Sequence, residues 1–127
     1  MAAAEAIKAA GLEDKVEYIA FDYATCKALA AAYPESMVQF LCDNASQVRT
    51  PAQLNNDGGI SIDYNGNMLT SNPTFIDDAH KLGLVVNVWT IRSNEEFGEW
   101  INKGIDFITT DIPDVGMKYM EYYNLNK

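Results

Sequence analysis

Short runs of apolar residues alternate along the chain with longer segments in which apolar residues recur at helical spacing. The runs are rich in β-branched and aromatic residues and are bounded by charged or turn-forming residues, a pattern typical of strands. They predict strands at residues 16–21, 37–41, 60–64, 84–89 and 105–109. The intervening segments predict helices at residues 3–10, 23–33, 72–82, 93–103 and from 111 onward.

Capping residues set the bounds of several of these helices. Asn72 followed by Pro73 predicts a helix start, with Asn as the N-cap and Pro in the first turn. The spacing of Ser93 and Glu96 is that of a capping box. Gly11 is a natural stop for the first helix, because glycine tolerates the left-handed conformation at a helix end.

The remaining segments are polar or rich in turn residues. Residues 43–58 predict a loop with one helical turn near 51–54. Asn65-Gly66 has the composition of a hairpin turn, but no strand follows it, so we expect none there. The regular alternation of strand and helix implies parallel strands joined by crossover helices. Near-continuously apolar strands suit a parallel sheet covered by helices, so the fold class is α/β, either an open doubly wound sheet or a barrel.

In both architectures, functional groups lie at the carboxyl ends of the strands. Asp22, Asp63 and Asp111 stand at three of these ends, and a hard divalent cation binds several such oxygens. Asp22 and Asp111 also precede predicted helices, where a carboxylate caps exposed N–H groups. Capping is the favoured role for both.

Aromatic residues at the same ends offer an apolar wall for a small polar ligand: Phe21, Tyr64 and Trp89. Trp89 ends an apolar strand, which favours a position in the core. Its indole N–H needs a partner, which favours the polar carboxyl end of the sheet, and the two positions fit equally well. The single histidine, His80, falls within a predicted helix, away from the strand ends, and a structural role is expected. The sequence has no P-loop, no GxGxxG and no zinc-type Cys/His cluster.

Charge and composition narrow the classes of partner. A net charge of −9 argues against a nucleic-acid or anionic-membrane partner, since both require a positive surface. The sequence contains no apolar run of membrane-spanning length, and its first residues lack the features of a secretory signal. Cys26 and Cys42 are expected to be free, buried thiols. We expect a soluble protein of bacterial type, cytoplasmic or periplasmic.

Two stretches near the C-terminus resemble the end of glycerophosphodiester phosphodiesterases. In that family the seventh strand ends in a Trp-Thr pair, as at Trp89-Thr90. The eighth strand ends in Thr-Asp or Thr-Asn followed closely by Pro, as at Thr110-Asp111 and Pro113. The pairing of these two features is the most specific part of the resemblance.

The earlier strands resemble the same family more weakly. Residues 16–21 are similar to its fourth strand, which usually ends in Ser-Phe, although Ala20 stands here in place of Ser. Residues 37–41 and 59–64 resemble its fifth and sixth strands. The resemblance therefore covers nearly the whole chain, 1–127, as the C-terminal part of one (β/α)8-barrel domain, with about five strands and their crossover helices.

The resemblance implies a hydrolase that converts a glycerophosphodiester and water to glycerol 3-phosphate and an alcohol. The family uses a divalent metal, Ca or Mg, held by carboxylates on its second and third strands, and two histidines as acid and base. These lie in His-Arg-Gly and His-Asp motifs, and neither motif occurs in this sequence. The resemblance therefore implies no catalytic or metal-binding residue here, and we expect this chain alone to be inactive and to bind no metal.

The resemblance does carry over substrate-side residues. Phe21, Leu41 and Trp89 match positions that line the family's pocket for the glycerol or alcohol group, and Tyr64 is a weaker candidate. Arg92 follows the Trp-Thr pair and is within reach of an anion, although an exposed role is the commoner one for arginine.

Three functional interpretations remain open from the sequence. The chain is an enzyme fragment, or a complete enzyme built by association with a metal on the strand-end aspartates, or a non-catalytic binding module. A TIM barrel needs eight strands, and five cannot close. The open edges and apolar interior predict a homo-oligomer or pairing with a missing N-terminal half.

Overall fold

A computed structural model describes residues 2–125. It contains one sheet in which five parallel strands follow one another in chain order. The strands are β1 (Glu17–Ala20), β2 (Met37–Cys42), β3 (Ser61–Asn65), β4 (Val86–Trp89) and β5 (Phe107–Ile108). All five strand predictions are confirmed, with differences of one to a few residues at the ends.

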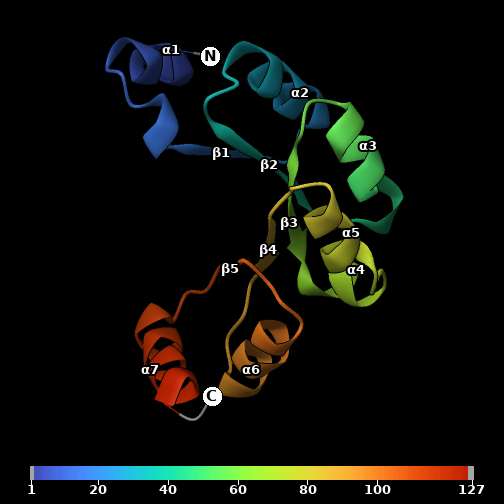
Figure 1. Cartoon of the computed structure of the whole chain (residues 1–127), viewed down its shortest axis with the longest axis vertical. Helices are drawn as coiled ribbons and strands as arrows, with labels where there is room; N and C mark the ends of the chain where they lie inside the picture. Colours follow the sequence, from blue (N-terminus) through green and yellow to red (C-terminus); the bar gives the residue numbers. More distant parts are fainter. Residues whose placement is uncertain (1, 126–127) are drawn as a thin grey trace.

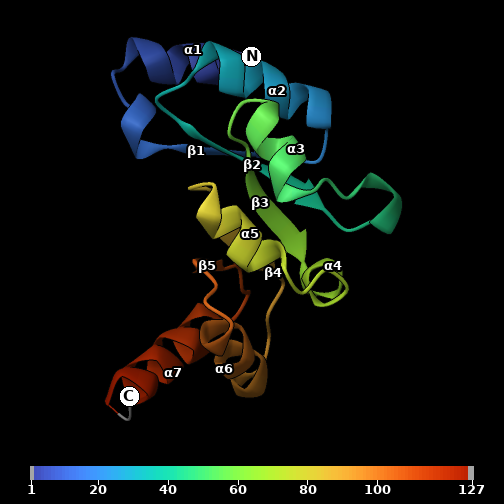
Figure 2. The same ribbon diagram turned by 45° about the vertical axis from the view of Figure 1, so that its right-hand side comes forward.

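Helices connect the strands and lie along the outer side of the sheet in Figure 1, and the rotated view in Figure 2 brings part of this layer to the front. They are α1 (Ala2–Ala9), α2 (Tyr23–Ala32), α3 (Pro51–Asn56), α4 (Gly66–Thr70), α5 (Phe75–Lys81), α6 (Asn94–Asn102) and α7 (Pro113–Leu125), with 3-10 turns η1 (Glu13–Lys15) and η2 (Ala45–Gln47). The sheet and helices form an open arc, with β1 near one end and β5 near the other (Figure 1). This arrangement confirms a partial (β/α)8 barrel.

The helix start predicted at Asn72 is wrong. The chain forms a short extra helix, α4, directly after β3, and Asn65 caps it by accepting a hydrogen bond from the Asn67 N–H at 2.9 Å. Asn72 then donates its side-chain amide to the Met68 carbonyl at 2.8 Å, at the end of α4, and α5 begins only at Phe75. The side chain that suits an N-cap therefore satisfies a carbonyl of the preceding helix.

The Ser93 cap is confirmed. Its Oγ accepts a hydrogen bond from the Glu96 N–H at 3.2 Å, and its hydroxyl donates to the Glu96 carboxylate at 3.1 Å. The glutamate therefore reaches the serine side chain and not its backbone N–H, so one half of the capping box is replaced by a side-chain contact.

The main core lies between the sheet and the helices. Alternate residues of β3 and β4 point toward the helices, and Ile62, Tyr64, Val86 and Val88 are fully buried there. Leu54 of α3 is equally inaccessible. At about 25 cal/mol per Å² of apolar area, this layer supplies the main favourable free energy of folding.

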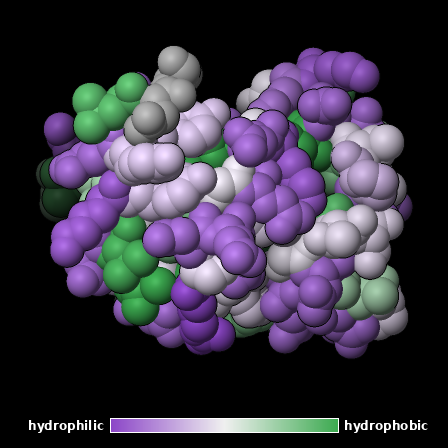
Figure 3. All heavy atoms as spheres, turned by 90° about the horizontal axis from the view of Figure 1, so that it is seen from below, coloured by the Kyte–Doolittle hydropathy of each residue, from purple (hydrophilic) through white to green (hydrophobic). Residues whose placement is uncertain are grey.

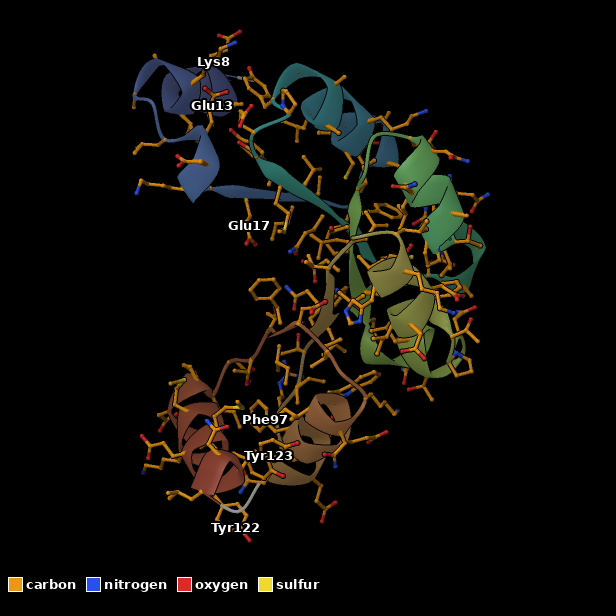
Figure 4. All side chains as sticks on the ribbon, viewed as in Figure 1. Lys8, Glu13, Glu17, Phe97, Tyr122 and Tyr123 are labelled. Atoms are coloured by element: carbon orange, nitrogen blue, oxygen red, sulfur yellow. The ribbon has the colours of Figure 1, made fainter. Side chains whose placement is uncertain are left out.

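The other set of alternate residues faces the inner, concave side of the arc. Figure 4 shows Glu17 pointing from β1 into this open side. The strand register places Leu41, Asp63 and Asn87 side by side on neighbouring strands of the same face. This inner face would be the interior of a closed barrel, and it carries the candidate site.

Candidate site on the inner face of the sheet

Three of the four proposed substrate-side residues come together at the carboxyl end of the sheet. Phe21, Leu41 and Trp89 line a pocket of about 190 Å³. The other lining residues are Ile19, Asp63, Thr90 and Thr109. The pocket is therefore mainly apolar, with one carboxyl group and two hydroxyl groups.

Trp89 belongs to the mouth of the sheet. Its indole N–H donates to the Asp63 backbone carbonyl at 2.8 Å, which fixes the ring across the neighbouring strand. Phe21 meets the ring edge-to-face, with centroids 5.9 Å apart and planes at 87°. The peptide bond between Trp89 and Thr90 is cis. The two rings form one wall, and Phe21 remains 58% exposed to solvent.

Tyr64 does not belong to this pocket. It follows Asp63 in β3, so its side chain points to the opposite, helix-covered face, where it is fully buried. Its hydroxyl donates to the Arg49 carbonyl at 2.7 Å and accepts from the Arg49 N–H at 3.1 Å. The placement of Tyr64 at the mouth is corrected: the residue anchors the loop before α3.

Asp63 is a buried polar residue of the pocket with an unsatisfied oxygen. Its side chain is buried, with 2% of the residue exposed, and its Oδ1 atom has no hydrogen-bond partner. Burial, and after it the nearby negative charge of Glu17, together raise the pKa of this carboxyl group to about 7.

The other two strand-end aspartates have local partners. Asp22 caps α2 by accepting hydrogen bonds from the Thr25 N–H at 3.0 Å and the Thr25 hydroxyl at 2.5 Å, and these bonds lower its pKa. Asp111 accepts from Arg92 Nε at 2.8 Å, and this hydrogen bond lowers the pKa of Asp111. The favoured local role of Asp22 is confirmed, whereas Asp111 has an ion-pair partner. Arg92 is thereby engaged with a carboxylate.

A line of polar side chains crosses the inner face, and sequence reasoning missed it. Gln39 donates to Glu17 at 3.4 Å and accepts from the Asn87 amide at 3.4 Å. The Thr109 hydroxyl donates to the Asn87 carbonyl oxygen at 3.1 Å. The line thus joins β1, β2, β4 and the end of β5. Each member is a polar residue in or next to an otherwise mainly apolar strand, at a position that alternation assigns to the inner face, and this is the sequence signal that could have found it.

His80 lies at the opposite end of the strands from the pocket. Its Nε2 is 2.7 Å from Asp106 Oδ2, and the same oxygen accepts the Val86 N–H at 2.8 Å. Asp106 therefore connects α5 to the start of β4, which agrees with a structural role for His80. Cys26 and Cys42 are free and buried, as expected.

A larger hollow of about 390 Å³ lies between α6, β5 and α7. Its walls are apolar, with Phe97, Ile101, Met117 and Met120 among the lining residues, and Asp106 contributes the only carboxyl group in it. Figure 4 shows Phe97 between the two helices. This larger hollow lacks a set of converging polar groups. The smaller pocket at the strand ends is therefore the better candidate site.

The strand-end carboxylates do not form a metal site. Among residues 2–125, no three His, Cys, Asp or Glu side chains lie close enough together to hold a metal ion. Asp22 and Asp111 are engaged locally, which leaves Asp63 as a single unpartnered carboxyl. A Ca or Mg ion takes several oxygen ligands, so these residues alone do not fit one.

The surface of the molecule and the length of its helices bear on contact with a membrane. The end of the molecule in Figure 3 is mainly hydrophilic, with small separate apolar patches. Within residues 2–125, no helix combines the length and the apolar character needed to cross a membrane.

A curved sheet of parallel strands, an outer layer of helices and a pocket at the carboxyl ends define part of a TIM barrel. The model of the glycerophosphoryl diester phosphodiesterase family matches residues 2–115. The chain therefore belongs to the glycerophosphodiester phosphodiesterase family. A search of curated proteins gave no match.

Solved structures share this fold. A glycerophosphodiester phosphodiesterase from Parabacteroides distasonis is 30% identical, with a TM-score of 0.87 over 96% of this chain and 50% of the other. A putative glycerophosphoryl diester phosphodiesterase from Silicibacter pomeroyi is 21% identical, with a TM-score of 0.77 over 92% of this chain and 41% of the other. An Oleispira antarctica phosphodiesterase, solved with sn-glycerol-3-phosphate, is 16% identical, with a TM-score of 0.66 over 87% of this chain and 51% of the other. This chain thus spans about half the length of these proteins.

Proposed function

We propose that this chain provides the substrate-orienting half of a glycerophosphodiester phosphodiesterase barrel. In this role Phe21, Leu41 and Trp89 hold the glycerol or alcohol group of the substrate. The observation that carries the proposal is their convergence on one pocket at the carboxyl ends of the strands, in a chain of this family. Apolar walls orient the carbon skeleton, while the phosphate is held elsewhere.

The second part of the proposal is that hydrolysis requires the strands that precede β1 in the family barrel. The His-Arg-Gly and His-Asp motifs are absent from the sequence, and the described carboxylates form no metal site. The divalent metal and the acid–base histidines would then come from a complementary segment. No catalytic step is assigned to residues of this chain.

The test is release of glycerol 3-phosphate from glycerophosphocholine, with and without Ca or Mg. We expect no release by the purified chain and metal-dependent release after addition of a segment that carries strands one to three of a family barrel. Metal-dependent release by the chain alone would overturn the second part, because the strand-end aspartates would then form a site of their own.

A matched pair of substitutions tests the pocket in the reconstituted barrel. Phe21→Ala removes an aromatic wall that is already 58% exposed, so we expect KM to rise with little loss of stability. Leu12→Ala removes a side chain that is 43% exposed and lies outside the pocket, and we expect unchanged kinetics. Equal kinetics for the two variants would remove Phe21 from the proposed site.

The open edges of the sheet support the proposal that this chain needs a partner. In the described chain β1 and β5 each pair on one side only, and Ile19 and Phe107 expose apolar side chains nearby. We infer that either a second copy or the missing half of the barrel covers them. Light scattering of the purified chain separates the two: a monomer that becomes a one-to-one complex with the added segment favours the missing half.

A further inference from the structure

We propose that Asp63 is a specificity-determining residue, which accepts a hydrogen bond from a hydroxyl group on the polyol part of the substrate. This inference rests on the proposed function. It gives Asp63 a role that neither the family match nor the apolar pocket residues assign to it. It starts from a buried carboxyl oxygen, Oδ1, that has no hydrogen-bond partner and belongs to a residue lining the pocket at the strand ends.

An unpartnered buried acceptor is unusual. Most buried polar atoms are hydrogen-bonded, and one that is not has lost its water without replacement. Asp63 belongs to the wall of the pocket, and its backbone carbonyl is already used by the Trp89 indole. The Trp89 indole therefore fixes the backbone of Asp63 beside the pocket, while the buried Oδ1 of its side chain has no donor.

The neighbouring polar side chains do not supply that donor. Gln39 donates to Glu17, Asn87 donates to Gln39, and the Thr109 hydroxyl donates to Asn87. These groups form a line of their own across the inner face. A donor for Asp63 then comes from outside this line, and we assign it to a molecule in the pocket that Asp63 lines.

The chemistry of the pocket selects a hydroxyl donor on a carbon skeleton. A phosphate group is disfavoured in the immediate surroundings of Asp63, because the nearby Glu17 carboxylate repels an anion. The pocket lining includes no Lys or Arg, and Phe21, Leu41 and Trp89 present apolar surface. A polyol meets both demands: its C–H groups pack on the rings, and one hydroxyl donates to Asp63.

This role explains why a destabilising residue occupies the position. The carboxyl gains no hydrogen bond in the free chain, so a side chain of similar size without charge makes the free chain more stable. Asp63→Leu is therefore expected to raise the urea midpoint of unfolding and at the same time to weaken polyol binding. Opposite changes in stability and binding are the signature of a functional group, because a purely structural residue would lose both together.

The experiment uses the full chain and two phosphate monoesters that differ only in hydroxyl content: glycerol 3-phosphate and propyl phosphate. Binding is followed by the indole N–H signal of Trp89 in ¹H–¹⁵N spectra, because Trp89 contacts the backbone of Asp63. The shared phosphate cancels in the comparison. The variants are Asp63→Leu, Asp63→Asn as a conservative replacement that keeps an acceptor, and Asp14→Leu as a control that removes an exposed carboxylate outside the pocket.

At pH 8, where the Asp63 carboxyl is mainly ionised, we expect the natural chain and Asp14→Leu to bind glycerol 3-phosphate roughly tenfold more tightly than propyl phosphate, the scale of one hydrogen bond to a charged group. Asp63→Asn should keep part of this preference, and Asp63→Leu should abolish it while still binding propyl phosphate. An undiminished preference in Asp63→Leu overturns the assignment. So does the absence of any preference, or of any binding, in the natural chain.

The proposed function is judged separately, by glycerol 3-phosphate release from the reconstituted barrel. If release is restored and Asp63→Leu leaves the preference for glycerol 3-phosphate intact, the inference fails and the proposed function stands. If release is not restored while the binding preference depends on Asp63, the proposed function fails and the polyol subsite stands.

Discussion

Replacing Asp63 by Asn should make the chain more stable at neutral and alkaline pH and remove part of its pH dependence. The substitution keeps the size and shape of the side chain and removes the ionisable group. In the folded chain the pKa of Asp63 is raised to about 7 from an ordinary value of 3.8, first by burial and then by Glu17. The folded state therefore holds a proton on Asp63 over a range of pH in which the unfolded chain has released it.

The sign and size of the effect follow from proton linkage. Where the folded state binds more protons than the unfolded state, stability falls as the pH rises. Asp63 therefore favours the fold below a pH of about 4, and this contribution is lost progressively between about 4 and 7. One pKa unit corresponds to about 1.4 kcal/mol, so three units give an upper limit of about 4 kcal/mol, and entry of water around the carboxyl reduces this to roughly 2–4 kcal/mol.

Urea unfolding at pH 5 and pH 8 measures the effect. From pH 5 to pH 8 the free energy of unfolding of the natural chain should fall by roughly 1–3 kcal/mol more than that of Asp63→Asn. The m-values of the two proteins should be equal. Every other titrating group is shared, so the difference between the two proteins isolates Asp63. The reasoning is refuted if both proteins show the same change with pH, or if the natural chain gains stability relative to the variant as the pH rises.

Three further substitutions test the fold. Ser93→Ala removes the oxygen that accepts the Glu96 N–H and should lower the free energy of unfolding by about 1 kcal/mol, seen as a lower urea midpoint. Tyr64→Phe removes the hydroxyl bonded to the Arg49 backbone and should cost about 1–2 kcal/mol, while leaving ligand preference unchanged, since the ring lies outside the pocket. Leu54→Ala empties a fully buried site and should cost about 2–5 kcal/mol by the same assay.

The elements most accurately predicted from sequence are those that local chemistry determines. The Ser93 cap depends on a spacing of three residues, and Gly11 does adopt the positive φ of 70° expected of a helix stop. The parallel order of the strands follows from their alternation with helices, because parallel neighbours need a crossover between them. Neither inference required knowledge of distant contacts.

The errors arose where two local signals competed or a distant contact decided the outcome. Asn72 has the composition of an N-cap, but the extra helix α4 places it beside the Met68 carbonyl. The partner of Asp111 is Arg92, nineteen positions away in sequence. Only the pairing of β4 with β5 brings these two segments together, and no local pattern contains that information.

The orientation of the site residues was available in the sequence, through a period of two. Treating the strands as near-continuously apolar hides that Ser61, Asp63 and Asn65 alternate with apolar residues that face the helices. The same alternation separates Asp63 from Tyr64, so it excludes Tyr64 from the pocket and includes Asp63. Strand alternation was therefore a better guide to the site than residue type.

The polar character of the inner face is itself an argument for function. The interior of a TIM barrel is usually filled by layers of Val, Ile and Leu, which stabilise the closed sheet. Here the register places Asp63 beside Asn87, where an apolar pair would contribute more to stability. A carboxyl without a hydrogen bond at Oδ1 makes this position costly in the free chain. Because most residues at such positions serve packing, retention of a costly one at the mouth of a pocket is best explained by a ligand that supplies the missing donor.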